Sequence, residues 1–313
     1  MKAPTNQAVT FIKPHAVSSP AAVAHVLDVF RRHGIAVVER RSVPAADMAA
    51  GGLIDRHYAN NARFGTADNA QSLTLRDAAK DVFRTAFDEE WDAVVREGRV
   101  FSGEAMRRRL GNLSGEALNA LWARHGARKL CGGCYVSRFE PENCYVVNGF
   151  YPSIREQFTR PGAAVELFLV AFELPWRTFR SDVIGSTNPA AAEEQSIRGY
   201  LHDHAGEFGL RIDARDNVIH ASASPFEALC EARIWMPARS LSRDPLWRLI
   251  HRKAGLPAPA LAARLEHWHA TNPMATLAGR TEPLLDLLED LDTPAAAAAL
   301  LDVLASPGDA AAP

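Results

Sequence analysis

Four short segments carry side chains that could do chemistry. They are residues 11–17 (FIKPHAV), 185–189 (GSTNP), 196–199 (SIRG) and 217–224 (NVIHASAS). Together they hold a histidine, which can act as a nucleophile, and the cations and hydrogen-bond donors that phosphoryl transfer requires. Each segment alone is a weak signal, because a histidine after a strand is more often structural than catalytic. Their order and spacing therefore decide the interpretation.

In this order the segments resemble sequences of the nucleoside diphosphate kinase family. That family carries a Lys-Pro-Asp loop, a Gly-x-Thr-Asn-Pro turn, an Ile-Arg-Gly segment and the pattern Asn-x-x-His-Gly-Ser-x-Ser. The resemblance covers about residues 5–60 and 146–237, which is half of the chain. It leaves the stretch between these parts and the C-terminal stretch without a counterpart.

The spacing of the matched residues strengthens this resemblance. Thr187 and Arg198 lie eleven residues apart, as in the family. Glu231 follows His220 by eleven residues, and Trp235 follows that glutamate by four. Several independent agreements at fixed spacing are hard to obtain by chance.

The resemblance implies two-step covalent catalysis at His220. Family members pass a phosphoryl group from a nucleoside triphosphate to a nucleoside diphosphate through a phosphohistidine, which needs a neutral imidazole nitrogen. An acceptor must hold the other ring nitrogen and fix its tautomer. The resemblance gives this role to Glu231, supported by Ser222. ATP or another nucleoside triphosphate, bound with Mg²⁺, is the expected donor.

Further matched positions are expected to bind the nucleotide. The residues that match phosphate and sugar contacts are Lys13, Thr187, Arg198 and Asn217. Tyr58 matches a tyrosine that lies close to the phosphates. Phe150 or Tyr151 matches the aromatic residue that stacks on the base, and Phe64 is a weaker alternative. No residue of the chain itself is expected to form a separate metal site.

Three departures from the family pattern bear on activity. The family's Lys-Pro-Asp ends here in His15, which affects the loop more than the chemistry. A second phosphate-binding arginine is replaced by Ser181, and we expect Arg180, or else Arg177, to substitute for it. The aspartate that helps to hold magnesium is Ala223. Losing one arginine and one metal contact would cost about 2–4 kcal/mol of transition-state stabilisation.

These observations leave three functions open. The leading hypothesis is a phosphotransferase that works by ping-pong between nucleoside triphosphates and diphosphates. A second keeps the histidine nucleophile but uses a specialised acceptor, which the long insert between the matched parts favours. A third is a nucleotide-binding or regulatory module in which transfer has lapsed, which the residues at 181 and 223 favour.

The elements that must position these residues follow from hydrophobic periodicity and capping signals. Strands are predicted at residues 8–12, 35–38, 144–147, 163–172 and 218–222, and helices at 20–33, 44–58, 75–97, 152–158 and 224–235. The last helix begins with a capping box, Ser-Pro-Phe-Glu. The histidine thus ends a strand, and its glutamate partner lies on the helix that follows.

The resemblance implies a ferredoxin-like α/β sandwich with a four-stranded antiparallel sheet. Residues 1–60 and 144–239 are expected to form this discontinuous domain. Residues 61–143 are predicted to be a helical insert, and residues 240–313 a helical C-terminal extension. The family's habit of assembly implies a homo-oligomer, at least a dimer.

Length and composition set the broad class. The chain has 313 residues, 47% of them hydrophobic and 23% charged, with a net charge of −2. This excludes a disordered, collagen-like or coiled-coil chain and gives no electrostatic reason to expect nucleic-acid binding. No apolar run reaches the ~18 residues of a membrane span, and the N-terminus lacks the apolar core of a signal peptide. We therefore expect a soluble, cytoplasmic protein that does not bind membranes.

The four cysteines are too few for a disulfide scaffold in a chain of this length. Cys131 and Cys134 form a Cys-x-x-Cys pair around two glycines. No second pair completes a zinc site, which needs four ligands. Buried free thiols are the favoured interpretation, with zinc or redox chemistry left as the alternative.

Overall fold

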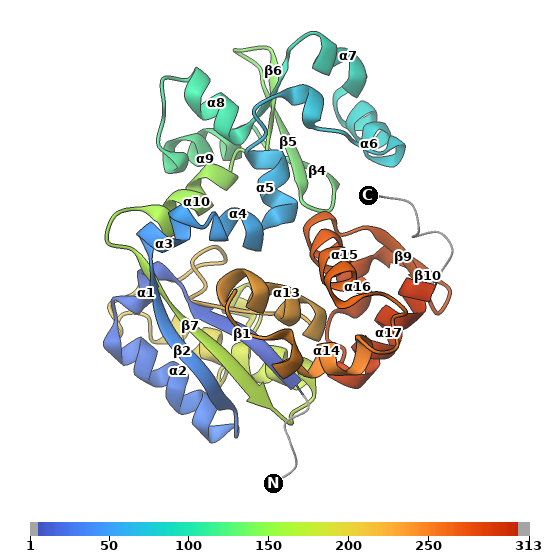
Figure 1. The fold of residues 1–313 in the computed structure, drawn as a ribbon. Coiled ribbons are helices and arrows are strands. Elements are labelled where there is room, and N and C mark those ends of the chain that lie inside the picture. Colours follow the sequence, from blue (N-terminus) through green and yellow to red (C-terminus); the bar gives the residue numbers. More distant parts are fainter. Residues whose placement is uncertain (1–5, 306–313) are drawn as a thin grey trace. The chain divides into compact units, whose positions relative to one another are not determined.

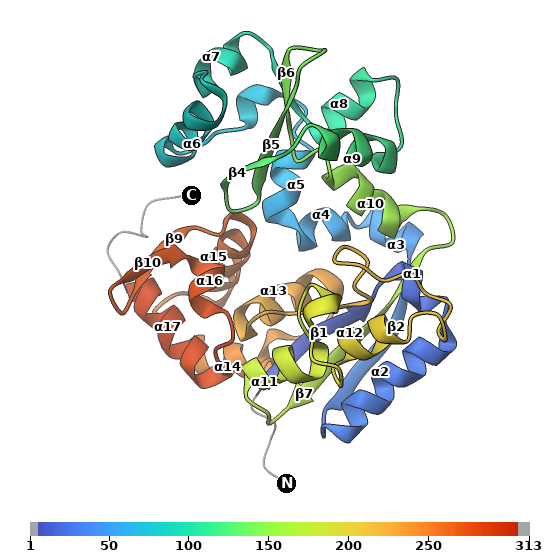
Figure 2. The same ribbon diagram turned by 180° about the vertical axis from the view of Figure 1, so that it is seen from behind.

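The structure, a computed structural model, describes residues 6–305. The chain divides into two units. The first contains the described residues up to Asp47 and from Pro161 onward, and the second is Met48–Arg160. Each unit contains a four-stranded sheet of its own (Figures 1 and 2). The outermost residues of the predicted parts 1–60 and 240–313 lie outside the described residues.

The sheet of the first unit has the order β2-β7-β1-β8, and all neighbouring strands are antiparallel. Its strands are β1 (Asn6–Ile12), β2 (Ala36–Pro44), β7 (Ala164–Phe172) and β8 (Ile219–Ala221). Helix α2 (Pro20–Arg32) connects β1 to β2, and α12 (Ile197–Asp203) lies between β7 and β8. This β-α-β-β-α-β path is ferredoxin-like. The predicted four-stranded antiparallel sheet is confirmed.

Helices cover both faces of this sheet, because alternate side chains of β1 point to opposite sides. On one face Ile12 packs in a core with Phe30 of α2 and Leu201 of α12. On the other face the ring centroid of Phe11 lies 5.1 Å from that of Trp235, on α13 (Pro225–Trp235). The interior strand β1 is buried along its whole length. The face under α13 is the one that carries His220.

Shorter elements complete the first unit. Before the histidine strand lie α1 (Pro14–Val17), α3 (Ala45–Ala50, which runs into the second unit), α11 (Trp176–Thr178), the π-helical turn η2 (Phe179–Ile184) and η3 (Pro189–Ala191). After α13 come η4 (Leu241–Arg243), α14 (Pro245–Ile250), α15 (Ala258–Thr271), β9 (Met274–Leu277), β10 (Arg280–Pro283), α16 (Leu284–Leu288) and α17 (Thr293–Ala305). The extension predicted to be helical therefore also contains a β-hairpin.

The second unit has a mixed sheet of order β3-β6-β5-β4, in which β3 and β6 are parallel. Its strands are β3 (Val100–Ser102), β4 (Arg128–Cys131), β5 (Cys134–Phe139) and β6 (Cys144–Val147). Its helices are α4 (Leu53–His57), α5 (Ala59–Gly65), η1 (Ala70–Ser72), α6 (Asp77–Phe87), α7 (Trp91–Arg96), α8 (Gly103–Arg109), α9 (Gly115–Arg124) and α10 (Tyr151–Thr159). The segment 61–143, predicted to be a mostly helical insert, is helical in part but also contains β3, β4 and β5. These three strands have only three to six residues and carry too little periodicity to be recognised, whereas β6 matches the strand predicted at 144–147.

Residues 48–60 and 144–160 pack within the second unit, whereas the sequence assigns them to the sandwich domain. Tyr151 of α10 donates a 2.7 Å hydrogen bond to Asp55 of α4, and Arg155 pairs with the same carboxylate. These contacts join the two ends of the unit. They depend on pairs about a hundred residues apart in sequence, which local patterns do not reveal.

Two long predicted helices are interrupted. The helix predicted at 75–97 is divided into α6 and α7, because Asp88 adopts a left-handed conformation with φ of 55°. The helix predicted at 44–58 is divided into α3 and α4 at Gly52, whose φ is also 55°. A left-handed residue ends an α-helix whatever its hydrophobic face.

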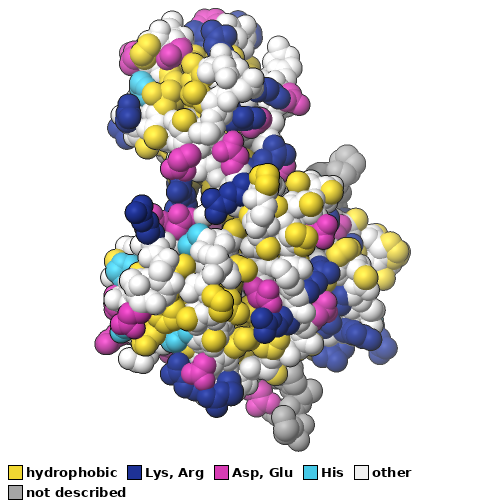
Figure 3. Space-filling view, turned by 90° about the vertical axis from the view of Figure 1, so that its left-hand side faces the viewer, with side chains coloured by type: hydrophobic (Ala, Val, Ile, Leu, Met, Phe, Trp, Pro, Cys, Tyr) yellow, Lys and Arg dark blue, Asp and Glu magenta, His cyan; other side chains and the backbone are white. Residues whose placement is uncertain are grey.

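Charges are mixed over the surface. On the side drawn in Figure 3, acidic and basic side chains lie among one another. Several form local ion pairs, such as Arg31 with Asp28 on α2 at 2.6 Å, and Arg40 with Glu166 across β2 and β7 at 2.5 Å. Within residues 6–305, no helix is both long and apolar enough to cross a membrane.

Candidate active site

His220 lies in the middle of β8, opposite Phe11 of β1. Its ring stacks on the Phe11 ring, with centroids 4.7 Å apart and planes inclined by 23°. The histidine side chain is 18% exposed. Strand pairing and stacking therefore fix the ring, while part of the side chain stays accessible.

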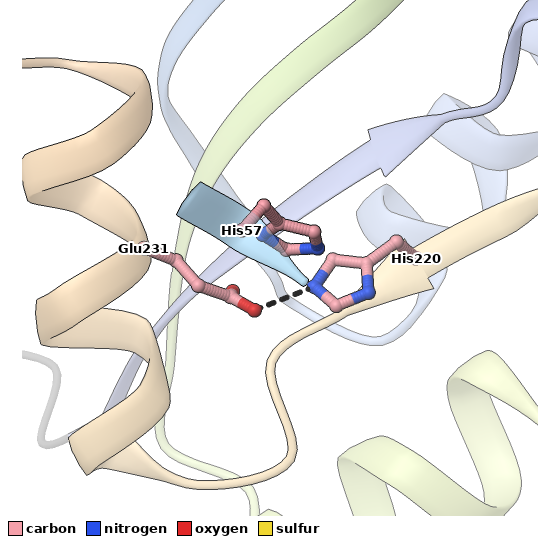
Figure 4. A group of neighbouring side chains, drawn as sticks. All are labelled: His57, His220 and Glu231. Atoms are coloured by element: carbon pink, nitrogen blue, oxygen red, sulfur yellow. Dashed lines mark hydrogen bonds and ion pairs between the residues drawn. The ribbon is translucent and has the colours of Figure 1, made fainter. Parts of the chain in front are cut away.

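Glu231 and Ser222 continue from this ring as a chain of hydrogen bonds. Nε2 of His220 lies 2.9 Å from Oε1 of Glu231 (Figure 4). The other carboxylate oxygen accepts a 2.6 Å bond from the Ser222 hydroxyl, and that hydroxyl accepts a 3.0 Å bond from the Val9 backbone N–H. An acceptor at Nε2 favours the tautomer with its proton there, which places the ring's lone pair on Nδ1.

Helix α13 carries Glu231 to this position. The helix begins with Ser224 as N-cap, whose hydroxyl accepts a 3.2 Å bond from the Glu227 backbone N–H. Pro225 occupies the first turn, where its missing N–H costs nothing. Glu231 itself is 3% exposed. A buried carboxylate that faces an imidazole and a hydroxyl has its charge satisfied and its orientation fixed.

The surroundings of His220 keep its imidazole neutral. Burial is the main cause that holds the pKa of His220 well below its usual range. The positive charges of Lys13, Arg198 and Arg180 act in the same direction. A neutral imidazole at physiological pH is the nucleophilic form.

A tight turn precedes the histidine strand. Val218 has a φ of 70°, and around it the Ile219 N–H donates a 2.8 Å bond to the Asn217 carbonyl. Such three-residue turns are rare, and a β-branched residue in this region costs roughly 1–3 kcal/mol. The turn directs the Val218 carbonyl to the backbone N–H of Lys13, at 2.7 Å. The sequence gives no signal for it, since no glycine marks the position.

Lys13 lies where β1 ends and α1 begins. Its ammonium donates a 2.8 Å bond to the carbonyl of Arg215. Burial, and then the charge of Arg198, lower the pKa of Lys13 to about 8. A cation that is already partly dehydrated loses little further hydration when it meets a phosphate.

Three of the predicted segments converge beside β8. Arg198 on α12 donates bonds of 2.9 Å to the Gly185 carbonyl and 2.8 Å to the Ile219 carbonyl. The Asn217 side chain donates a 2.9 Å bond to the Thr187 carbonyl. Gly185 has a φ of 94°, and a Cβ there would collide with the Ser196 hydroxyl, so this turn requires glycine. The structure thus brings together seven matched residues of the first unit: Lys13, Thr187, Arg198, Asn217, His220, Ser222 and Glu231.

Arg180, the expected substitute for the arginine missing at 181, has other partners. Its guanidinium forms ion pairs with Glu289 at 2.6 Å and Asp290 at 2.7 Å, in the segment between α16 and α17. The Asp290 backbone N–H also donates a 3.1 Å bond to the Ala223 carbonyl. The C-terminal extension therefore places two carboxylates beside this arginine, which sequence reasoning missed.

Glu227 is a second carboxyl that sequence reasoning placed only in a helix cap. Its Oε2 accepts a 2.6 Å bond from the Ala223 N–H. Burial, together with the charge of Glu231, raises the pKa of Glu227 to about 8. At pH 7 this group is therefore mostly protonated.

The expected nucleotide residues Tyr58 and Phe150 lie in the second unit. The Tyr58 ring packs edge-on against His57, with centroids 4.5 Å apart. Phe150 is half-buried and contacts the Trp122 ring, at 5.4 Å between centroids. The alternatives Tyr151 and Phe64 are buried within that unit, with 0% and 3% exposure.

Comparisons with known proteins give distant structural matches. No protein-family model matches the chain, and no curated protein matches it in sequence. Among solved structures, a nucleoside diphosphate kinase from Encephalitozoon cuniculi matches with a TM-score of 0.36 and 13% identity, over 74% of this chain and 88% of that one. An NDP kinase from Pyrobaculum aerophilum gives 0.36 and 16%, over 74% and 96%.

A nucleoside-diphosphate kinase from Borrelia burgdorferi, solved with bound vanadate and ADP as a transition-state mimic, gives a TM-score of 0.34 and 18% identity. The match covers 74% of this chain and 86% of that one. At such scores the likeness says nothing about function.

Proposed function

We propose that this protein is a phosphotransferase that moves the γ-phosphate of a nucleoside triphosphate to a nucleoside diphosphate through a phosphohistidine at His220. The observation that carries the proposal is the hydrogen-bonded chain from His220 through Glu231 to Ser222. This chain orients a neutral imidazole beside two cations, Lys13 and Arg198. A covalent phosphoryl carrier needs that combination.

In the first half-reaction, Nδ1 of His220 attacks the γ-phosphorus. The P–N bond forms while the bond from phosphorus to the β,γ-bridging oxygen breaks, and the nucleoside diphosphate leaves. Positive charge develops on the ring, and Glu231 stabilises it through the Nε2–H bond. In the second half-reaction, a terminal phosphate oxygen of the acceptor attacks the same phosphorus; the P–O bond forms while the P–N bond breaks, which releases the nucleoside triphosphate and restores the neutral ring.

Lys13 and Arg198 would neutralise the migrating phosphoryl group. The low pKa of Lys13 in the free protein rises again when a phosphate dianion approaches, because the opposite charge favours the ammonium form. Arg198 is fixed by two backbone carbonyls and therefore needs little reorganisation. Such preorganised cations stabilise the transition state more than the ground state.

Magnesium enters as part of the triphosphate substrate. Residue 223 is alanine and offers no side-chain oxygen, while the Asp290 carboxylate beside it is paired with Arg180. In this chain the ion's ligands would therefore come mainly from the phosphates and water, an arrangement that is common for Mg²⁺. The ion would then spread charge over the transferred group.

The test is incubation with γ-³²P-labelled ATP and magnesium, with wild type beside His220→Ala. We expect a protein-bound label that survives base, is lost in acid, and is absent from the variant. Unlabelled nucleoside diphosphates should then discharge the label as nucleoside triphosphate. A label that persists in His220→Ala, or no label at saturating nucleotide, would overturn the proposal.

Two alternatives have their own support. The presence of the second unit favours transfer to a specialised acceptor. This alternative would replace the main proposal if ordinary nucleoside diphosphates failed to discharge the label from the protein. A module that binds nucleotide without transfer is favoured by the ion pairs of Arg180 and by Ala223. Calorimetric binding of nucleotide without any phosphohistidine would select it.

We also propose that the chain assembles into a homo-oligomer, at least a dimer. Strand β2 is an edge of the first unit's sheet, and its Val37 and Val38 are 39% and 48% exposed. An edge with exposed valines is a ready surface for pairing. Light scattering after gel filtration should give a mass of at least two chains, and a single-chain mass at working concentration would contradict this.

A further inference from the structure

The hairpin of β4 and β5 in the second unit carries two cysteines face to face. Cys131 ends β4, Cys134 begins β5, and the two are direct cross-strand partners across Gly132 and Gly133. The two thiols interact through a side-chain hydrogen bond. All four cysteines of the chain are free thiols in the structure. The two thiols thus lie on neighbouring strands, opposite each other at the end of the hairpin.

The turn between them is held firmly. Gly133 has a φ of 74°, and a Cβ there would lie 2.7 Å from Asn60. The Asn148 side chain donates a 2.7 Å bond to the Gly133 carbonyl and accepts a 2.9 Å bond from the Tyr135 N–H. Asn60 and Asn148 both contact Gly133 and therefore fix the turn between the two cysteines.

The two thiols differ in access and charge. Cys131 is partly exposed, whereas Cys134 is buried in a core with Val136 and Tyr145. The hydrogen bond from Cys134, followed by the cations Arg63, Arg76 and Lys129, lowers the pKa of Cys131 to about 7. The hydrogen bond and burial raise the pKa of Cys134. One member is thus an accessible thiolate and the other a protected thiol.

We propose that Cys131 and Cys134 are a redox-active dithiol that exchanges with low-molecular-weight disulfides. The Cys131 thiolate attacks one sulfur of the disulfide RSSR, breaks its S–S bond, and releases RS⁻, which takes up a proton. Cys134 then loses its proton and attacks the Cys131 sulfur of the mixed disulfide, which releases the second thiol. The protein dithiol is oxidised to a Cys131–Cys134 disulfide, and RSSR is reduced to two RSH.

This inference does not depend on the proposed phosphotransfer. A metal site is the competing use of paired cysteines, and zinc requires four ligands. Among the described residues of the second unit, no histidine or carboxylate joins the two sulfurs in a group of three possible ligands. The arrangement of one exposed attacking thiol and one buried resolving thiol is instead that of an exchange pair.

The test uses the full chain, equilibrated in mixtures of oxidised and reduced glutathione, quenched in acid, and alkylated after unfolding. Mass spectrometry should show loss of two alkylatable thiols and a disulfide between residues 131 and 134. Cys134→Ser should stop at a glutathione adduct on Cys131. Cys131→Ser should react at least about tenfold more slowly, because only the buried thiol remains.

Cys144→Ser is the matched control, since Cys144 is a buried thiol on β6 of the same sheet. It should behave as wild type. If residues 131 and 134 of the wild-type protein stay alkylatable under the most oxidising mixture, the proposal is overturned, and this readout needs no variant. Retention of zinc by the reduced wild type and its loss in Cys131→Ser would overturn it in favour of a metal site.

Discussion

The two units each place a proposed nucleophile on a short strand beside a strained or glycine-dependent turn. The reactive form differs: it is the neutral imidazole for the histidine and the thiolate anion for the cysteine. His220 follows the left-handed Val218, and Cys131 precedes the left-handed Gly133. Burial chiefly lowers the pKa of His220 and the hydrogen bond with Cys134 chiefly lowers that of Cys131, while nearby cations act in the same direction on both. For an imidazole the lower pKa preserves the neutral base, whereas for a thiol it produces the anion. A lowered pKa therefore yields the reactive form of each group.

The difference lies in the partner that completes each site. In the proposed transfer, Glu231 supplies an acceptor and a counter-charge for the histidine, which would become cationic during the reaction. Cys134 supplies a donor to the cysteine, which must be anionic before reaction. We expect substitution of Glu231 to lower the reaction rate more than substitution of Cys134, because Glu231 stabilises charge that develops in the transition state.

The largest expected effect comes from Glu231→Gln. An amide keeps the shape of the side chain but removes the charge that stabilises the phosphorylated ring, so phosphorylation by ATP should slow by roughly 10²- to 10⁴-fold. Rapid-quench measurement of labelled protein checks this. Glu227→Gln is the matched control, because it neutralises a buried carboxyl on the same helix that is already mostly protonated at pH 7. Equal losses in both variants would refute the role given to Glu231.

The pH profile separates the two ionising groups of the histidine site. The pKa of His220 lies well below its usual range, so the ring stays neutral as pH falls through 6.5 and the rate should hold there. Lys13 has a pKa of about 8, so its charge is lost as pH rises through 8. The value of kcat/KM for Mg-ATP should then fall by about tenfold per pH unit.

Lys13→Arg provides the control for this profile. Arginine stays charged throughout, so the decline above pH 8 should disappear, at a lower overall rate because the geometry differs. An unchanged alkaline limb in this variant, or an acid limb centred near pH 6.5 in the wild type, would contradict the assignment of the two groups.

The cysteine site should titrate with the opposite sign. With a pKa of about 7, Cys131 has about a tenfold larger thiolate fraction at pH 8 than at pH 6 and should be alkylated about tenfold faster. Arg63→Gln removes a cation and should slow alkylation at pH 7 by roughly two- to fivefold. Peptide mapping with iodoacetamide checks this, and burial raises the pKa of Cys144 to about 11, which makes that thiol an internal control. A faster reaction in Arg63→Gln would rule out cation activation.

Sequence patterns located the histidine site better than the cysteine site, for a physical reason. The contact between His220 and Glu231 joins a strand to the next helix, so its two residues lie at a short separation in sequence that a motif can record. The turn at Val218 left no trace, because its left-handed position holds a valine and not the glycine that usually marks such a conformation. The short strands β3, β4 and β5 were missed for lack of periodicity, and with them the cross-strand pairing of Cys131 with Cys134.

The Arg180 environment was equally hidden, since it depends on residues more than a hundred positions away. Arg180 is 27% exposed, and its partners Glu289 and Asp290 are 45% and 37% exposed. Exposed pairs contribute little to stability, so neutralising both carboxylates should leave the fold intact. In this respect Arg180 differs from Lys13 and Arg198, which bond to backbone carbonyls.

A further effect of modest size follows from this difference. In the double variant Glu289→Gln, Asp290→Asn, the Arg180 guanidinium is released toward the phosphates, and the Kd for Mg-ATP, measured by calorimetry, should fall by roughly three- to tenfold, about 1 kcal/mol. Adding Arg180→Gln should abolish the gain. A gain that survives in the triple variant would mean that the two carboxylates act by repelling the nucleotide directly. No gain in the double variant would mean that Arg180 serves only to hold the C-terminal extension.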